Sequence, residues 1–330
     1  MKISVIGAGA WGTTIAELLG KKGFKVTLWV HGEKTFQAIE KWNENIFYLK
    51  GVKLLHISYF TMNLKEALDS ADVIVLAVPA QKLRGVIKNV QPANTPVIIN
   101  LAKGIEISSK KRMSQVVKEI WYNIPAENIA SLSGPNFSFE IAREMPAATV
   151  IGGKDKFILK KLQDILMTDY FRVYYTEDIT GVELGGSLKN VLAIGGGISD
   201  GLGFGDSSKS SLIVRGVAEL VRFGTKLGGR KETFYGLSGI GDLIATSFSK
   251  LSRNRWAGEE IGKGRSKGEI EAFTNQIVEG MYTVKSVYMI KEKFNIDMPI
   301  TTAIYNIIYL HNSPKDELRK LMRRPGKRES

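Results

Sequence analysis

The sequence predicts an α/β protein in two parts: a doubly wound, mostly parallel sheet at the N-terminal end and an all-helical domain after it. Three observations predict this arrangement. Short apolar runs alternate with helical patterns up to about residue 178, and after it the strand signals fade while helical periodicity dominates. A glycine-rich turn also separates the first strand from the first helix. We therefore expect two domains, residues 1–178 and residues 179–330.

The glycine-rich turn follows a short apolar strand at residues 2–6. Its glycines, Gly7, Gly9 and Gly12, have the spacing G-x-G-x-x-G, and a helical pattern and a second strand from Lys25 come next. This order is the dinucleotide-binding unit of a Rossmann-type domain. Gly7 allows the tight turn, Gly9 lets the backbone approach a pyrophosphate, and Gly12 permits close helix packing. The helix N-terminus then offers free N–H groups to the phosphates.

Further elements follow from the same periodicities. Strands are expected at residues 71–79, 96–102, 129–133, 147–152 and 171–175, with helices at residues 64–68, 81–90 and 113–121. In the second half, helices are expected at residues 183–195, 209–228, 251–261, 283–294 and 299–310. The glycine-rich segment after residue 195 is expected to leave the helix, and residues 239–243 are expected to form a loop.

The end of the second strand bears on the choice of cofactor. An acidic residue usually stands there to bind the ribose 2′-hydroxyl of NADH. This chain has His31 instead, and the nearest acid is Glu33. Because His31 or Lys34 could attract a 2′-phosphate, the sequence weakly favours NADPH over NADH.

Composition excludes several kinds of chemistry. The 330 residues are 44% hydrophobic and 24% charged, which is ordinary for a globular protein. Without cysteine there is no disulfide and no thiolate catalysis, and three histidines without an H-x-x-x-H pair argue against a metal site. No apolar run has the length of a membrane span, and the glycines explain the N-terminus better than a signal peptide does. We expect a cytoplasmic protein without an integral membrane segment.

The net charge of +13 leaves anionic partners open, including phosphorylated small molecules, nucleic acid and anionic membrane. Part of this charge lies in a basic tail at residues 319–328, and such a tail is usually solvated. The tail slightly favours a nucleic-acid-binding or nucleotide-sensing protein that has kept the fold. The residues considered next argue instead for a small phosphorylated substrate and no nucleic acid.

The stretch from residue 181 to residue 219 contains one lysine among small and apolar residues. Leu184, Leu188, Val191 and Leu192 recur at helical spacing around Lys189. A lysine on such a helix often extends its ammonium to water. If it is buried instead, its pKa falls toward the range useful for proton transfer. The neighbouring Asn190, Asp200 and Asp206 favour a functional role.

Other charged residues stand where ligands bind. Lys103 follows a strand, at the edge where open α/β sheets bind ligands. Arg253 and Arg255 lie beside a serine and an asparagine at a helix start, a combination suited to an anion. These cations and Lys189 could converge on a phosphorylated substrate, with Asp242 offsetting their charge. Taken alone, each could equally be an exposed surface charge.

Together these segments resemble one known family. Residues 1–315 are similar to the bacterial type of NAD(P)-dependent glycerol-3-phosphate dehydrogenase. The most specific segments are Gly7–Gly12, Leu101–Gly104, Ser133–Pro135, Leu188–Val191, Asp200–Asp206, Gly239–Leu243, Ser252–Asn254 and Val278–Gly280. Several specific motifs in the correct order leave little room for accident.

The resemblance implies a reaction and a set of residues. The family reduces dihydroxyacetone phosphate to sn-glycerol 3-phosphate with NADPH or NADH, which supplies the phospholipid backbone. Lys189 matches the proton donor of the reduction. The matching substrate-binding positions are Lys103, Gly134, Asn136, Asp242, Ser252, Arg253 and Asn254. The matching cofactor-binding positions are Gly7, Gly9, Ala10, Trp11, Gly12, His31, Lys103, Ser138, Arg253, Ile277 and Glu279.

Four of these positions depart from the family pattern. Ala10 replaces a common serine, His31 a common arginine, Asn136 a serine or threonine, and Ser138 an alanine. Backbone contacts survive such changes more readily than side-chain contacts do. The family is commonly dimeric, so a homodimer is one expectation. The alternatives are another 3-hydroxyacid or sugar-acid dehydrogenase, or a non-catalytic nucleotide sensor. UDP-sugar oxidation through a thiohemiacetal is excluded because it needs a cysteine.

Overall fold

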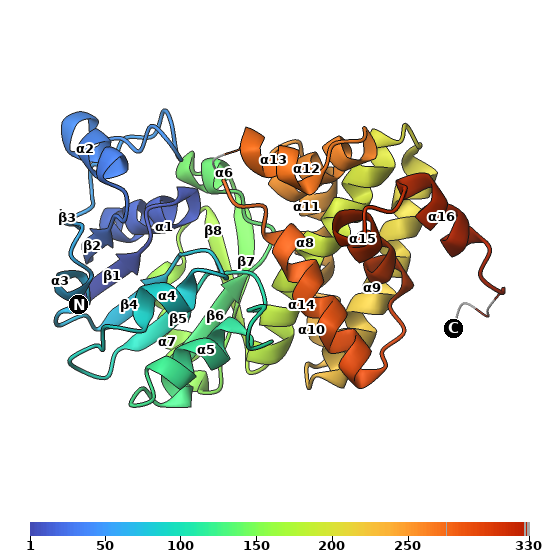
Figure 1. Ribbon diagram of the computed structural model, residues 1–330. Helices are drawn as coiled ribbons and strands as arrows, with labels where there is room; N and C mark the ends of the chain where they lie inside the picture. Colours follow the sequence, from blue (N-terminus) through green and yellow to red (C-terminus); the bar gives the residue numbers. More distant parts are fainter. Residues whose placement is uncertain (275, 327, 329–330) are drawn as a thin grey trace.

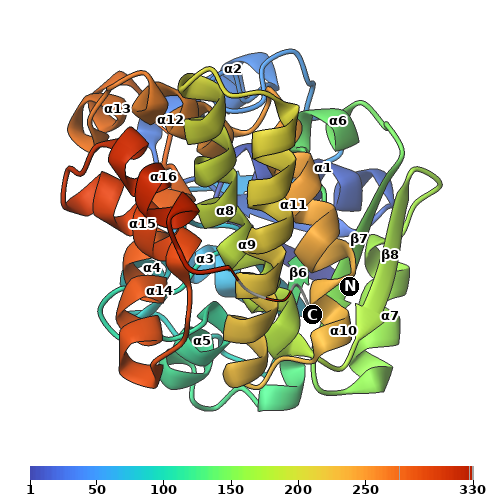
Figure 2. The ribbon, with the colours of Figure 1, turned by 90° about the vertical axis from the view of Figure 1, so that its right-hand side faces the viewer.

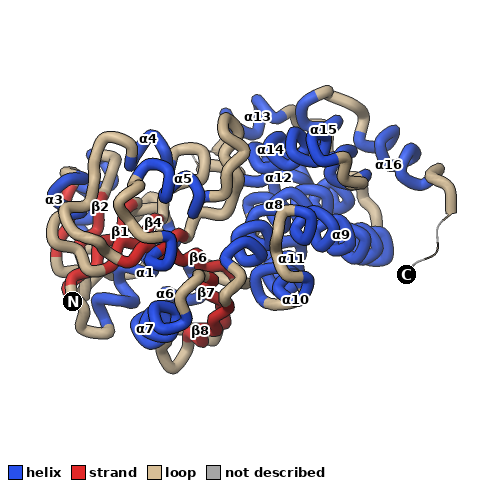
Figure 3. Tube along the Cα trace, turned by 90° about the horizontal axis from the view of Figure 1, so that it is seen from below, coloured by secondary structure: helices blue, strands red, loops and turns tan. Residues whose placement is uncertain are grey.

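The computed structural model describes residues 1–274, 276–326 and 328. The basic tail's Lys327 therefore lies outside the described residues. All strands of the described residues gather in the half of the molecule that holds the N-terminus, and helices of the second half of the chain fill the opposite end (Figures 1 and 3). The expected fold class, a Rossmann-type sheet followed by a helical domain, is confirmed.

The sheet has eight strands in the order β3-β2-β1-β4-β5-β6-β7-β8. Only the pair β6 and β7 is antiparallel among the named strands that the structure describes, so the expectation of a mostly parallel sheet is confirmed. The strands are β1 (Lys2–Ile6), β2 (Lys25–Trp29), β3 (Tyr59–Thr61), β4 (Val73–Leu76), β5 (Val97–Asn100), β6 (Ile129–Ser133), β7 (Ala147–Gly152) and β8 (Phe171–Thr176).

Both faces of the sheet are buried, which explains the continuous apolar runs in the central strands. Neighbouring residues of β4 belong to different cores: Val73 and Val75 to one, Ile74 and Leu76 to the other. The helices of this half are α1 (Ala10–Lys21), α2 (Glu33–Trp42), α3 (Leu64–Leu68), α4 (Leu83–Ile87), α5 (Met113–Ile120), α6 (Ser138–Ala142) and α7 (Lys156–Leu166), with a 3₁₀ turn at Ala126–Asn128.

The helical half is built around α8 (Ile179–Gly201), which α9, α11, α12 and α14 all contact. Figure 2 shows α8 behind α9 in the centre of this half. The other elements are α9 (Asp206–Lys226), α10 (Lys231–Phe234), a π-helical turn (Leu237–Gly241), α11 (Asp242–Phe248), α12 (Arg253–Gly262), α13 (Lys267–Phe273), α14 (Glu279–Phe294), α15 (Pro299–Tyr309) and α16 (Pro314–Met322).

Two sequence predictions about glycine-rich segments are wrong. The helix expected to end at residue 195 continues to Gly201, and residues 239–243 are not a loop but a π-helical turn that runs into α11. Isolated glycines weaken a helix, so the sequence pattern predicted breaks. Packing overrides that preference: a Cβ on Gly185 of α8 would lie 2.7 Å from the carbonyl oxygen of Ser238 in the π-helical turn.

The glycines of α8 and α12 let these helices pack backbone against backbone. A Cβ added to Gly197 would lie 2.0 Å from the carbonyl oxygen of Arg255, and one added to Gly201 would lie 2.1 Å from that of Glu259. From the other side, a Cβ on Gly258 would lie 2.1 Å from the carbonyl oxygen of Ile194. The close approach therefore requires glycine on both helices.

No helix within the described part of the chain combines the length and the apolar character needed to cross a membrane.

The substitution Gly258→Ala tests the contact between α8 and α12. We expect it to lower the free energy of unfolding by about 3 kcal/mol, the upper range for overpacking a core, because the backbones must separate to admit the methyl group. The matched control is Gly268→Ala on α13, where a Cβ meets nothing within 4 Å. That change should be neutral or stabilise by up to about 1 kcal/mol. Urea unfolding measures both, and equal effects would contradict the proposed contact.

Candidate active site

Lys189 lies on α8, and its side chain is largely buried. The residue is 7% exposed, and its Nζ lies 2.9 Å from Oδ1 of Asp242. Nζ also donates a hydrogen bond of 2.7 Å to Oγ1 of Thr246. The lysine that the sequence singled out is therefore a buried cation with two polar partners on α11, rather than one that extends to water.

Asp242, the first residue of α11, contacts two lysines. Its Oδ2 accepts a hydrogen bond of 2.6 Å from Nζ of Lys103, while its Oδ1 faces Lys189. Thr246 donates to Oδ1 at 3.1 Å. Burial acts to raise the pKa of Asp242, but the two lysines outweigh it and hold that pKa below its ordinary value. Asp242 therefore pairs with two of the four cations whose charge it was expected to offset.

Lys103 connects the two halves of the molecule. It follows the carboxyl end of β5, and its Nζ donates both to Asp242 and to the carbonyl oxygen of Gly134 at 3.1 Å. Gly134 lies just past β6, where a Cβ would come within 2.9 Å of the Thr149 backbone. The sheet edge and α11 therefore meet at one buried charge cluster, which contains Lys103, Lys189 and Asp242.

Burial is the main reason that the pKa of Lys189 falls, to about 8. Asp242 opposes this shift because its negative charge favours the ammonium. Lys103 and Arg253 lower the pKa further because they are cations. A group with this pKa is mostly protonated at neutral pH and can release its proton to a base within hydrogen-bonding distance.

Two amides extend the charge cluster toward α14. Nδ2 of Asn190 lies 3.4 Å from the carbonyl oxygen of Lys103, and Oδ1 of Asn190 accepts 2.9 Å from Nδ2 of Asn254. Oδ1 of Asn254 accepts from the N–H of Gly280 at 2.9 Å. This chain of hydrogen bonds fixes the orientation of both amides.

The start of α12 holds two further predicted residues. Ser252 caps this helix and accepts from the N–H of Arg255 at 3.2 Å. Arg253 is exposed, and its guanidinium donates to the carbonyl oxygen of Ile277 at 3.3 Å. The expectation that Arg255 lies with the other cations around one substrate is wrong, because its side chain pairs with Asp200 at 2.7 Å. Residues 253 and 255 are two apart on a helix, so their side chains point to different faces.

The glycine-rich turn has the geometry that a dinucleotide requires. Gly7 has a φ of +116°, and a Cβ on Gly12 would lie 2.0 Å from the carbonyl oxygen of Gly7. A Cβ on Gly9 would meet nothing within 4 Å, so space is open beside this residue. No side chain caps α1, whose first residues are Ala10 and Trp11, so its N-terminal N–H groups can bind phosphate. These residues fit a nicotinamide dinucleotide.

Glu279, at the start of α14, lies between the two halves. Its Oε1 accepts from the N–H of Ala80 at 3.1 Å, whereas its Oε2 is buried without a hydrogen-bond partner. Burial raises the pKa of Glu279 to about 7, although the Ala80 N–H and Arg253 oppose the shift. A buried carboxylate oxygen without a partner is suited to a ligand donor.

The remaining predicted positions lie farther from the charge cluster. Nδ2 of Asn136 donates to the carbonyl oxygen of Ala148 at 2.9 Å, and its buried Oδ1 has no partner. Ser138 begins α6, and its carbonyl oxygen accepts from Thr14 at 3.2 Å. His31 is exposed, with its ring 5.4 Å from that of Trp29.

Sequence reasoning missed Thr246 and Ser133, which both contact Asp242. Thr246 lies one helical turn after Asp242, and Oγ of Ser133 lies 3.4 Å from Oδ2 of Asp242. Once residues 242–248 are known to be helical, the i, i+4 spacing would have indicated Thr246. Ser133 lies in the Ser133–Pro135 segment, but nothing in that segment indicated its contact with Asp242, which depends on the fold.

The sheet, the glycine-rich turn and the buried lysine together define a two-domain dehydrogenase that uses a nicotinamide dinucleotide. Comparisons with known proteins specify the family. The model of the NAD-dependent glycerol-3-phosphate dehydrogenase N-terminus matches residues 2–158, and that of the C-terminus matches residues 178–319. The chain belongs to this family.

Relatives match over nearly the whole chain. The glycerol-3-phosphate dehydrogenase [NAD(P)+] of Thermoanaerobacter sp. is 44% identical over 332 residues, which cover 100% of this chain and 99% of that protein. That of Syntrophomonas wolfei is 43% identical, covering 99% and 96%. The crystal structure of glycerol-3-phosphate dehydrogenase from Coxiella burnetii has a TM-score of 0.92 at 32% identity, covering 98% of this chain and 99% of that one.

The charge cluster predicts how Lys189 titrates. Lysine labelled with ¹³C at Cε should show one side chain with a pKa of about 8, assigned by its absence in Lys189→Arg. Asp242→Asn removes the negative charge that favours the ammonium, so the transition should move to lower pH. NMR titration measures both. A transition at the ordinary lysine value of 10.5, or an upward shift in Asp242→Asn, would contradict the electrostatic account.

Proposed function

We propose that this chain reduces dihydroxyacetone phosphate to sn-glycerol 3-phosphate, reversibly, with Lys189 as the proton donor. The observation that carries the proposal is the buried Lys189 ammonium, placed beside Asp242 and Lys103 where the sheet edge meets the helical half. The product supplies the backbone of glycerophospholipids. The family membership supports the reaction, and the position of Lys189 supports its role.

The chemistry at the ketone explains why a buried lysine is useful. A bound nicotinamide would supply the hydride for the carbonyl carbon, and the electron pair of the C=O bond would then lie on the oxygen. Nζ of Lys189 donates a hydrogen bond to this oxygen and then transfers its proton, so that an alcohol and a neutral amine result. Asp242 keeps the Lys189 ammonium in place, and Lys103 lowers the affinity of the Lys189 amine for its proton.

The substrate phosphate requires cations and amide donors nearby. We assign this role to Arg253 and Asn254 at the start of α12, with Ser252 shaping the turn. Lys103, Gly134 and Asn136 lie across from them at the sheet edge and complete the proposed substrate contacts. Binding the phosphate at a fixed distance from Lys189 orients the ketone for reaction.

The cofactor would lie along the carboxyl edge of the sheet. Gly7, Gly9 and Gly12 would admit its pyrophosphate, with contacts from Ala10, Trp11 and Ser138. The cofactor would be faced on its opposite side by Ile277, Arg253, Lys103 and Glu279. The alanine at position 10 offers only backbone N–H to the phosphates. His31 is exposed at the end of β2, where it favours the 2′-phosphate of NADPH.

We also propose the domain boundary, the assembly and the location. The boundary between residues 178 and 179 falls at the start of α8, after the last strand of the sheet. A homodimer is supported by exposed apolar side chains on α9 and α11, namely Val214, Ile244 and Phe248. A monomeric mass by light scattering would contradict it.

The cytoplasm is the location where phosphorylated substrate and NADPH occur together, and fractionation tests this.

Lys189→Met should reduce turnover of dihydroxyacetone phosphate by about 10²-fold or more, because the proton donor is lost. Nicotinamide absorbance measures the rate, and fluorescence titration should show that NADPH still binds. The matched control is Lys209→Met, which removes another buried lysine, one paired with Asp200 at 2.8 Å on a remote part of α8. Near-normal turnover in Lys189→Met would overturn the assignment. Activity of the wild type toward a 3-hydroxyacid instead would identify another dehydrogenase.

His31→Ala should weaken NADPH binding severalfold and leave NADH binding almost unchanged, since only NADPH carries the 2′-phosphate. The comparison of KM for the two cofactors measures this effect. Lys41→Ala, which removes an exposed positive charge in the last turn of α2, provides the control. Equal changes for NADPH and NADH in His31→Ala would remove the basis for a preference at this position.

A further inference from the structure

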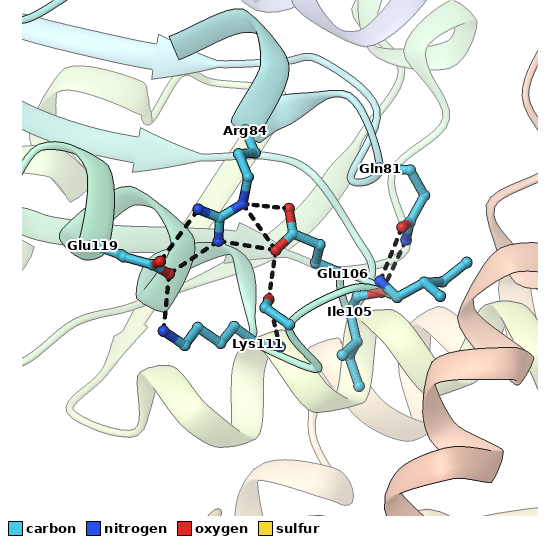
Figure 4. Close-up of polar contacts among 8 residues, drawn as sticks. Gln81, Arg84, Ile105, Glu106, Lys111 and Glu119 are labelled. Atoms are coloured by element: carbon cyan, nitrogen blue, oxygen red, sulfur yellow. Dashed lines mark hydrogen bonds and ion pairs between the residues drawn. The ribbon is translucent and has the colours of Figure 1, made fainter. Parts of the chain in front are cut away.

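The segment that carries Lys103 has no regular secondary structure and yet is held at several points. It runs from the end of β5 to the start of α5, residues 101–112. The side chain of Gln81 brackets it: Nε2 donates to the carbonyl oxygen of Ile105 at 2.8 Å, and Oε1 accepts from the N–H of Ile107 at 3.0 Å (Figure 4). These contacts fix the backbone two to four residues after Lys103.

An ion pair between Arg84 and Glu106 holds the same part of the segment more strongly. Arg84 on α4 donates to Glu106 through Nε at 2.9 Å and through Nη2 at 2.9 Å, and Figure 4 shows this fork. Glu106 is 4% exposed. Burial acts to raise the pKa of Glu106, but the bonds from Arg84 and Ser109 outweigh it and keep that pKa below its ordinary value. A bidentate pair with a buried carboxylate defines both distance and orientation.

The opposite side of this point contacts the helical half. The Ile105 side chain is 1% exposed and belongs to the apolar core of the helical domain. Its carbonyl oxygen also accepts from Oγ of Ser286 on α14 at 2.8 Å. The backbone at Gly104 is also tightly packed, because a Cβ added there would lie 2.6 Å from the Cβ of Ala80. Residues 105 and 106 are therefore held from both domains.

The far end of the segment is held separately. Arg112 pairs with Glu183 on α8, and the N–H of Ser114 donates to the same carboxylate at 2.7 Å. If the pair of Arg84 and Glu106 is lost, this end stays in place. The part that gains freedom is the start of the segment, which carries Lys103.

We propose that Arg84 and Glu106 are positioning residues that hold the Lys103 ammonium on Asp242 and thereby tune Lys189. The proposal rests on the proposed function, in which Lys189 is the proton donor. The charged groups that face Lys189 are Asp242 on α11, Lys103 after β5 and Arg253 on α12. When Lys103 withdraws, Asp242 acts on Lys189 without a competing cation, so the Lys189 ammonium becomes more stable.

The direction in which the pKa of Lys189 changes distinguishes positioning of Lys103 from a direct charge effect. Glu106→Gln removes a negative charge, which by itself would lower the pKa of Lys189. Withdrawal of Lys103 would raise that pKa. Arg84→Lys keeps the net charge and removes only the bidentate fork, so any shift it causes comes from movement of the segment. An upward shift in both variants is therefore the signature of positioning.

The experiment is the ¹³C titration of Lys189 in the full-length protein, together with kcat/KM for dihydroxyacetone phosphate. We expect Glu106→Gln and Arg84→Lys to move the Lys189 transition to higher pH and to lower kcat/KM about tenfold, mainly through KM. Glu106→Asp keeps the charge and should recover part of the loss. An unchanged or lowered transition in folded Arg84→Lys would overturn the proposal.

The control is Glu119→Gln. Glu119 on α5 also bonds to Arg84, at 2.9 Å, and to Lys111 near the far end of the segment, but its loss leaves the fork between Arg84 and Glu106 in place. Its loss should leave the Lys189 transition and kcat/KM unchanged, and a shift equal to that of Glu106→Gln would contradict a specific role for Glu106. The titration needs no turnover. If the wild type failed to reduce dihydroxyacetone phosphate, the proposed function would fail while the positioning effect could still be measured.

Discussion

One buried carboxylate determines how the two halves of this protein meet. Asp242 faces two lysines, Lys189 from α8 and Lys103 from the sheet edge, and without it two cations would share a buried site. Burying a charge is unfavourable unless it is paired, so both domains must place these side chains together. The same arrangement leaves Lys189 with a pKa of about 8, low enough for proton transfer at a moderate pH. The requirement for charge pairing and the requirement of the proposed proton transfer therefore coincide in one cluster.

Backbone packing around α8 makes that cluster possible. Because Gly197, Gly201 and Gly258 have no side chains, α12 lies against α8 closely enough for Asn254 to reach Asn190 at 2.9 Å. The amide contact then continues to the carbonyl oxygen of Lys103. Glycines that weaken a helix locally thus allow the short distance between these two helices. A bulkier residue there would move the proposed phosphate-binding residues away from Lys189, the proposed proton donor.

The network around Arg84 and Glu106 extends the same principle beyond the reacting groups. An irregular segment can place a lysine reproducibly only if its backbone is bonded on several sides. Here Gln81, Arg84 and Ser286 supply those bonds from three helical or loop elements of both domains. The position of Lys103 is therefore a property of the contact between domains, and so is its influence on Lys189.

The sequence by itself determined the fold class, the nucleotide-binding turn and the principal charged residues. Apolar runs, helical spacing and G-x-G-x-x-G are local patterns, and each limits the backbone directly. Only the tertiary structure decided that α8 continues through its glycines, that residues 237–248 are helical, and that Arg255 turns to Asp200 instead of the candidate site. It also brought Ser133 to Asp242, 109 residues away in the chain. These outcomes depend on packing between distant segments, and packing energies can exceed the small local preferences that sequence patterns report.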